Sequence, residues 1–136
     1  MYGQPRPTAY LDNEVLSASR ERLIPMLYDG ILKNLRRAGK QIAVRDLEGK
    51  SQSLQKASAI VYELLGSLDF EVGGELAQHL AGLYRYFGVE ILEISRTLDQ
   101  KRLERLIDMV ARLKGAWDDA ARQVATDRIG QTAHRG

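Results

Sequence analysis

The sequence predicts an all-α protein, an antiparallel four-helix bundle with a mobile N-terminal segment. Apolar residues recur at spacings of three and four, the period of an α-helix, and the alternating pattern of β-strands does not occur. The chain has 136 residues, of which 44% are hydrophobic, enough for one domain with a sizeable core. Short polar stretches separate the apolar segments, and helices joined by short links pack as antiparallel neighbours.

Four amphipathic segments, each long enough for a helix of about 20 residues, make up the predicted bundle. Their apolar stripes extend from Leu23 to Ile42, from Leu54 to Leu68, from Leu76 to Leu98 and from Leu103 to Val124. A second row of apolar residues lies beside these stripes and comprises Ile24, Tyr28, Leu32, Ile60, Leu65, Tyr84, Tyr86, Ile107 and Met109. This second row either broadens the core face or forms a hydrophobic groove for a helix of another chain.

Polar and glycine-containing stretches mark the predicted breaks between the helices. We place these breaks at 46–53, 69–74 and around 97–101. In the second break the paired glycines permit a sharp reversal, and Asp69 or Glu75 favours the N-terminus of the third helix. In the third break Asp99 is the expected N-cap of the last helix.

Pro25 complicates the start of the first helix. If the helix began after Ser19, Pro25 would lie a turn and a half inside it. There it would lose one hydrogen bond and crowd the carbonyl of Glu21, which costs about 3 kcal/mol in a regular helix. We therefore expect the regular helix to begin near Ile24, with Pro25 in its first turn, or to be kinked at Pro25.

The predicted domain organisation is a single helical bundle over residues 19–126. Residues 1–18 form a flexible N-terminal segment because their first part is rich in proline and glycine, and residues 127–136 form a flexible polar tail. No apolar run is long enough for a secretory signal or a membrane span. We therefore expect a soluble, cytoplasmic protein that does not insert into membranes.

The composition argues against catalysis, cofactors and nucleic-acid binding. Cysteine is absent and histidine occurs only at His79 and His134, so few side chains are suited to metal or acid–base chemistry. The carboxylates of 69–75 lack the ligand spacing of an EF-hand. With 20 basic and 18 acidic residues, the net charge of +2 is too balanced for an electrostatic nucleic-acid binder. We predict a non-enzymatic binding protein without metal, cofactor or nucleic-acid partner.

Several motifs resemble those of one known family. Residues 26–30 read MLYDG, residues 67–71 read SLDFE, and the string GGE follows at 73–75. Looser matches begin at Tyr10 and end with Leu113 and Trp117, so they span nearly the whole chain. This combination resembles the flagellar secretion chaperones of the FliS type. Two residues depart from the family pattern, since Arg20 replaces a frequent proline and Pro25 replaces a helix former.

The resemblance implies a cytoplasmic export chaperone without catalytic activity. Its client would be the disordered C-terminal segment of flagellin, which would wrap around the bundle and fold on binding. Covering this segment would prevent premature polymerisation and keep flagellin competent for flagellar type III export. Export-gate components and flagellar regulators are candidates for further partners. The alternative is a helical-bundle chaperone or regulator of a different secreted client.

The predicted partner-binding residues come from the apolar rows and from the family's mobile N-terminal segment. They are Tyr10, Val15, Tyr28, Ile60, Leu64, Leu68, Leu80, Tyr84 and Phe87. Tyr10 would act either as a contact with the client or as a lid over the core. Core and client contacts are both apolar, so the pattern alone does not separate them.

Overall fold

The computed structural model describes the backbone of residues 20–135, and nearly all of this range is helical. The helices are α2 (Arg20–Ala43), α3 (Leu47–Gly66), α4 (Phe70–Thr97) and α5 (Gln100–Arg135), with no strand among these residues. The all-α prediction is confirmed. The predicted segment 1–18 lies outside the described residues.

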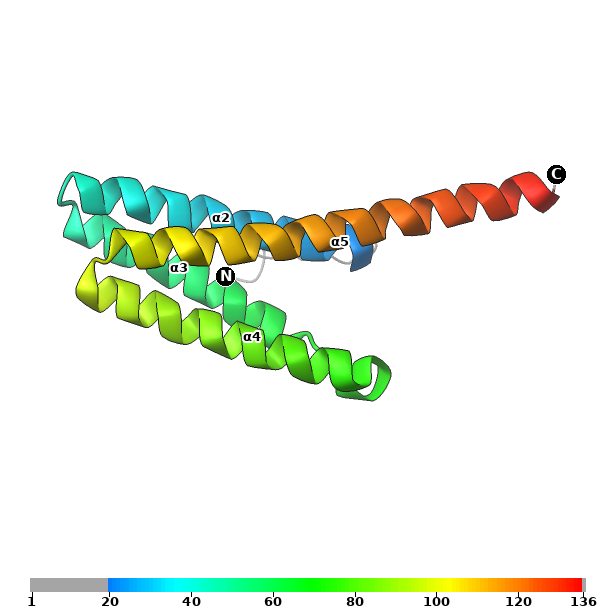
Figure 1. Cartoon of the computed structure of the whole chain (residues 1–136), viewed down its shortest axis with the longest axis horizontal. Helices are drawn as coiled ribbons and strands as arrows, with labels where there is room; N and C mark the ends of the chain where they lie inside the picture. Colours follow the sequence, from blue (N-terminus) through cyan, green and yellow to red (C-terminus); the bar gives the residue numbers. More distant parts are fainter. Residues whose placement is uncertain (1–19, 136) are drawn as a thin grey trace, which may run out of the picture.

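Successive helices run in opposite directions, as the antiparallel bundle prediction required (Figure 1). α2 packs closely against both α3 and α5, whereas α4 packs mainly against α3. The contact between α4 and α5 is much less extensive. The C-terminal part of α5 projects beyond the other three helices (Figure 1). One side of α4 is therefore left uncovered by the rest of the bundle.

The core lies where the predicted apolar stripes of the four helices meet. Its buried members are Tyr28, Ile31, Leu32, Leu35, Ala38, Ile42, Leu54, Ala57, Val61, Leu64, Leu80, Tyr84, Phe87, Ile91, Ile94, Leu103, Leu106 and Val110. Most of the second apolar row belongs to this core. Three of its nine members are buried, five are partly buried and pack against the core, and Tyr86 is exposed. For most of that row, the broad-core alternative is correct.

The connection between α2 and α3 is shorter than the sequence indicated. The side chain of Asp46 caps α3 by accepting a hydrogen bond from the backbone N–H of Gly49, with an N–O distance of 2.9 Å. α3 therefore begins at Leu47, and the predicted break over 46–53 is wrong. A side chain at Gly49 would collide with the capping carboxylate, so this glycine serves a helix cap and does not mark a loop.

The chain reverses direction between α3 and α4 as predicted, but α4 already begins at Phe70, before the paired glycines. Asp69 caps α4 by accepting hydrogen bonds from the backbone N–H groups of Glu71 and Val72, at 3.0 and 3.1 Å. One helical turn follows, and then Gly74 interrupts the helix with φ 52° and ψ −127°. Only glycine adopts this conformation readily, because a Cβ would clash with the backbone. Asp69 and not Glu75 provides the cap.

The last connection agrees with the prediction. Leu98 ends α4 in the left-handed conformation, with φ 60°, and Oδ1 of Asp99 accepts a hydrogen bond from the backbone N–H of Arg102 at 3.1 Å. Asp99 is thus the N-terminal cap of α5, and α4 and α5 meet in a tight turn.

Both ends of the bundle are more helical than expected. α2 begins at Arg20, so the expected start near Ile24 is wrong and Pro25 lies inside the helix. Proline this close to the N-terminus removes a single backbone hydrogen bond, and the residues before it are good helix formers. At the other end, α5 continues as a helix to Arg135, across most of the tail expected from residue 127.

Within the described range, no helix combines the length and the apolar character that crossing a membrane requires.

Candidate functional site

Large apolar side chains that remain exposed gather on α4. They are Phe70, Val72, Leu76, Tyr86, Val89 and Leu92, and Tyr62 on the neighbouring α3 is exposed as well. Leu92 is 70% exposed and Val89 is 58% exposed, although both lie within a long helix flanked by core residues. Val89 and Leu92 are three residues apart and lie on the same side of α4, and exposed apolar residues grouped in this way mark interaction surfaces more often than chance. We therefore take the outer face of α3 and α4 as the candidate site.

A groove of about 240 Å³ runs between α3 and α4 on this face. We call it the α3–α4 groove, and its lining consists of Ser51, Leu54, Gln55, Ser58, Tyr62, Gly88, Ile91, Leu92 and Ser95. Leu54, Gly88 and Ile91 are buried beneath the groove, whereas Tyr62 and Leu92 are exposed and give it apolar side chains. A groove with apolar walls and a few polar groups suits an amphipathic helix or an extended segment.

Tyr62 and Gly88 set the shape of the α3–α4 groove at its centre. A Cβ at position 88 would lie 3.2 Å from the Tyr62 hydroxyl, which is a tight contact. Glycine at this position therefore lets the tyrosine ring approach the backbone of α4. Tyr62 is 57% exposed, so its ring offers apolar area to a partner.

Polar contacts between the start of α3 and the end of α4 hold these two helices in register. The buried Lys50 donates hydrogen bonds from Nζ to the carbonyl oxygen of Ser95 at 3.0 Å and to its Oγ at 3.3 Å. These bonds satisfy a charged group that would otherwise be costly to bury. They also join the first turn of α3 to the last turns of α4, which fixes the width of the groove there.

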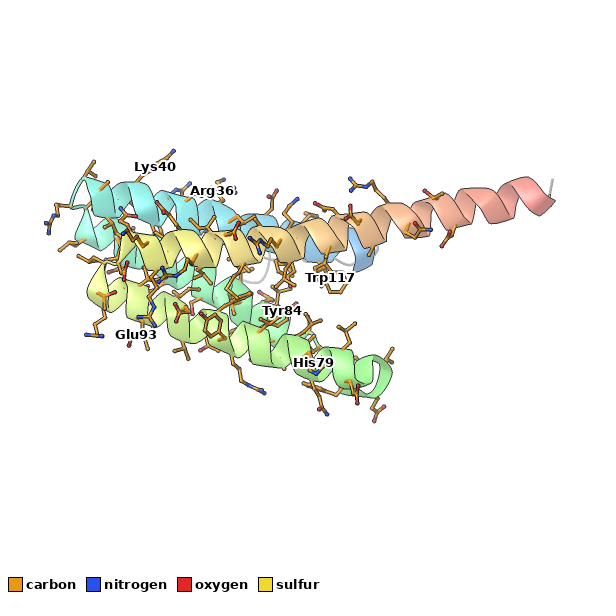
Figure 2. All side chains as sticks on the ribbon, in the orientation of Figure 1. Arg36, Lys40, His79, Tyr84, Glu93 and Trp117 are labelled. Atoms are coloured by element: carbon orange, nitrogen blue, oxygen red, sulfur yellow. The ribbon has the colours of Figure 1, made fainter. Side chains whose placement is uncertain are left out.

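A second polar cluster lies inside the core, where α2, α4 and α5 meet. The hydroxyl groups of Tyr28 and Tyr84 are 2.7 Å apart, and Nε1 of Trp117 donates a hydrogen bond to the Tyr28 hydroxyl at 3.3 Å. Burial raises the pKa of both tyrosines above its usual value near 10. Both tyrosines are thus neutral at physiological pH and form a structural cluster with Trp117. Figure 2 labels Tyr84 and Trp117.

Most of the predicted partner-binding residues face the core. Tyr28, Leu64, Tyr84 and Phe87 are essentially inaccessible, Leu80 is nearly so, and Ile60 and Leu68 are partly buried. Tyr10 and Val15 lie outside the described residues. The structure brings Tyr28 and Tyr84 together, but within the core and not on a surface. Their contact with a partner remains a prediction.

The exposed apolar residues in and beside the α3–α4 groove did not stand out in the sequence. Tyr62 and Leu92 fall outside the regular apolar stripes, and Val89 alternates with the buried pair of Phe87 and Ile91. The available signal is an excess of apolar residues on α4, because apolar side chains occur there on more than one face of the helix. His79, in contrast, is exposed.

The chemistry of this surface is that of binding. Among the residues that the structure describes, no three His, Cys, Asp or Glu side chains are grouped as a metal site. The carboxylates of Glu90 and Glu93 on α4 both form ion pairs with Arg102 of α5. The groove itself presents hydroxyl groups, an amide and apolar side chains, which can recognise a peptide through burial and hydrogen bonds.

The fold and this surface together define a class: an antiparallel helical bundle with an exposed apolar groove between two helices. Residues 2–124 match the family described as flagellar protein FliS, and the chain belongs to this family.

Individual relatives support the assignment. The chain is 34% identical to the flagellar secretion chaperone FliS of Campylobacter jejuni over 110 residues, covering 80% of this chain and 85% of the relative. It is 33% identical to the protein of that name from Escherichia coli over 125 residues, covering 88% and 92%. The corresponding Bacillus subtilis protein is 32% identical over 123 residues, with 90% and 91% covered.

The structure explains why the family motifs are spaced as they are. Tyr28 of the MLYDG string, Tyr84 after the GGE string, and Trp117 form the buried hydrogen-bonded cluster. Gly30 of the same MLYDG string lets α2 approach α3, because a Cβ there would lie 2.9 Å from Cδ1 of Ile60. The MLYDG string thus contacts Tyr84 and Trp117 from distant parts of the chain, and these contacts stabilise the bundle.

Proposed function

We propose that this protein is a cytoplasmic export chaperone that binds the disordered C-terminal segment of flagellin. Binding prevents premature polymerisation and keeps flagellin competent for flagellar type III export. The observation that carries this proposal is the α3–α4 groove, with Tyr62 and Leu92 exposed on a member of the FliS family. The protein acts by binding alone and has no catalytic role.

The physical basis is coupled folding and binding. A disordered segment that folds on a partner buries roughly 1,000–3,000 Å² and loses about 2–5 kcal/mol in ordering. The groove is smaller than such an interface, so the client also covers exposed apolar residues elsewhere on α4, among them Val72, Leu76 and Val89. A rigid bundle suits this role, because only the client has to become ordered.

The test is a titration of the protein with a peptide of flagellin's C-terminal segment, followed by calorimetry and circular dichroism. We expect a complex of near one-to-one stoichiometry and an increase in helicity on mixing. The variant Leu92→Glu places a charge in the groove and removes apolar burial, so binding should weaken roughly tenfold to a hundredfold.

The matched control is Val44→Glu. Val44 is 75% exposed in the connection between α2 and α3, away from the groove, and the charge change is the same. This variant should bind as the wild type does. Normal binding by Leu92→Glu would show that the groove is not the site, and no binding by the wild type would refute the proposed client. Glutamate at Leu64 or Tyr84 is unsuitable because both side chains are buried and the variants would unfold.

A further inference from the structure

The solvent-exposed face of α2 carries a concentrated positive charge. Lys33, Arg36, Arg37 and Lys40 are all exposed and lie within two helical turns, so we call them the basic face of α2. A shallow hollow of about 540 Å³ lies along this face, and the described residues that line it are these four together with Asp29 and Gly30. The basic face spans about 10 Å of the helix.

The four cations repel each other along the helix. Neighbours at i,i+3 and i,i+4 are Lys33 with Arg36 and Arg37, and Lys40 with Arg36 and Arg37, so four like-charge pairs share one face. Like charges at these spacings destabilise a helix. The helix dipole favours a cation only in the last turn, which accounts for Lys40 but not for the other three. An anionic partner would relieve the repulsion.

Within the described range, few negatively charged side chains of the protein offset the positive charge of the basic face of α2. None of the four cations takes part in a salt bridge there, whereas exposed cations on α4 and α5 do. Among the described residues, Asp29 is the one carboxylate that lines the hollow, and its charge also affects the pKa of Lys114 on α5. The pKa of Lys114 is raised first by its hydrogen bond with Asp118 and further by Asp29.

We propose that the basic face of α2 binds an acidic helical segment of a partner protein. A helix with carboxylates at i, i+3, i+4 and i+7 presents the same spacing as the four cations, so charges would pair along two turns of each helix. The energy comes from charge complementarity, and the contact is therefore weak to moderate and sensitive to salt. This surface is additional to the client-binding groove.

The surroundings of the basic face favour a peptide over a membrane or a nucleic acid. Membrane-surface helices place Trp, Phe or Leu beside their cations, whereas this face is bordered by Asp29 and Gly30. Single-stranded nucleic acids bind where aromatic rings stack with bases, and no aromatic residue lines the hollow among the described residues.

The position of the basic face permits a second partner alongside the client. Figure 2 shows Arg36 and Lys40 on the edge of the molecule remote from α4, whereas His79, Tyr84 and Glu93 lie on the α4 side. α3 and α4 form the client groove, so the two surfaces do not overlap. An acidic partner should therefore bind equally well with the groove empty or occupied.

The test uses a fluorescent helical peptide with glutamates at i, i+3, i+4 and i+7, and the same peptide with glutamines as its control. Fluorescence anisotropy with the full chain should show binding of the glutamate peptide at low salt, weakening as salt is added. Arg36→Glu with Lys40→Glu should weaken binding about tenfold or more. The double variant Lys101→Glu with Arg105→Glu changes the net charge equally on exposed positions of α5 and should bind normally.

Four outcomes would overturn the proposal. These are no binding of the glutamate peptide at low salt, equal binding of the glutamine peptide, equal losses in the two double variants, and stronger binding of phosphatidylglycerol vesicles or single-stranded DNA than of the peptide. Circular dichroism checks that both double variants stay folded. Retained binding of the acidic peptide by Leu92→Glu separates this proposal from the flagellin proposal.

Discussion

Tyr28 and Tyr84 place two hydroxyl groups in the apolar core, and the partly buried Trp117 adds an indole N–H at its edge. Each of these polar atoms has a partner. The hydroxyl of Tyr28 lies 2.7 Å from that of Tyr84 and accepts a hydrogen bond from Trp117. Buried polar groups stabilise a fold only when they are paired, and an unpaired one costs roughly 1–3 kcal/mol. The three side chains come from three helices, so their mutual pairing specifies how α2, α4 and α5 fit together.

The buried tyrosines should make the fold sensitive to alkaline pH. Burial raises the pKa of Tyr28 and Tyr84 in the folded state, whereas in the unfolded chain both titrate near 10. Above pH 10 the unfolded state loses protons that the folded state keeps. The two tyrosines therefore make their full contribution to the free energy of unfolding below pH 10, and this contribution decreases as the pH rises above 10.

Urea unfolding followed by Trp117 fluorescence, repeated across alkaline pH, measures this effect. The double variant Tyr28→Phe with Tyr84→Phe should show a shallower decline than the wild type. Lysines titrate in the same range but are common to both proteins, so the difference in slope isolates the two tyrosines. Tyr62→Phe, at an exposed position, should leave the wild-type slope unchanged. Equal slopes in all three proteins would contradict burial as the cause.

At the scale of the elements, α4 packs extensively against only one neighbouring helix. It packs along α3, but its contact with α5 is limited, and Arg102 of α5 pairs there with Glu90 and Glu93 of α4. Arg102 donates hydrogen bonds from Nε and Nη2 to the two carboxylate oxygens of Glu90, at 2.7 and 2.8 Å. Glu90 is buried, so this bidentate pair neutralises a carboxylate that would otherwise lie uncompensated at the interface.

Arg102→Ala should therefore loosen α4 from α5. We expect a clear loss of stability and faster amide hydrogen exchange in the C-terminal half of α4, because the Glu90 carboxylate is left without its cation. Arg96→Ala is the matched control, since Arg96 pairs with Glu93 on the same helix and is 70% exposed. It should unfold nearly like the wild type. Equal effects of the two variants would show that the bond to Glu90 does not hold α4 in place.

The same elements show what the sequence can predict. Helical spacing identified most core residues of the four helices, although Leu76 at the start of the third stripe is exposed. Asp99 was recognisable as a cap because a short polar side chain there meets free backbone N–H groups. Glycine and lysine after Asp46 resembled a loop, yet the capping bond makes them helical. Local composition does not reveal such a bond, and this is why the first break was wrong.

The candidate site was harder to predict for a related reason. Tyr28, Tyr84 and Phe87 are suited both to a core and to a binding surface, and the structure places them in the core. Whether an apolar helical residue is buried depends on which neighbouring helix covers it. α4 meets α5 only briefly, so Val89 and Leu92 remain exposed, and this feature of the tertiary packing cannot be read from the periodicity of α4.

At the scale of the whole molecule, two surfaces of opposite character lie on different helices. The α3–α4 groove is lined by apolar and small polar side chains, whereas the basic face of α2 is charged and exposed. Burial of apolar area releases water and gives a large negative heat-capacity change on binding, and it is insensitive to salt. Pairing of exposed charges has little heat-capacity change and weakens as salt is added.

These signatures yield a prediction for the complete protein. Calorimetry of the flagellin C-terminal peptide at several temperatures should give a large negative heat-capacity change that is nearly independent of salt, and Leu92→Glu should reduce its magnitude. The bound client should also stabilise the fold, by about 2.7 kcal/mol when its free concentration is a hundred times the Kd. A heat-capacity change near zero, or affinity that disappears with salt, would mean that the client binds through charge and that the exposed apolar residues of α4 serve another purpose.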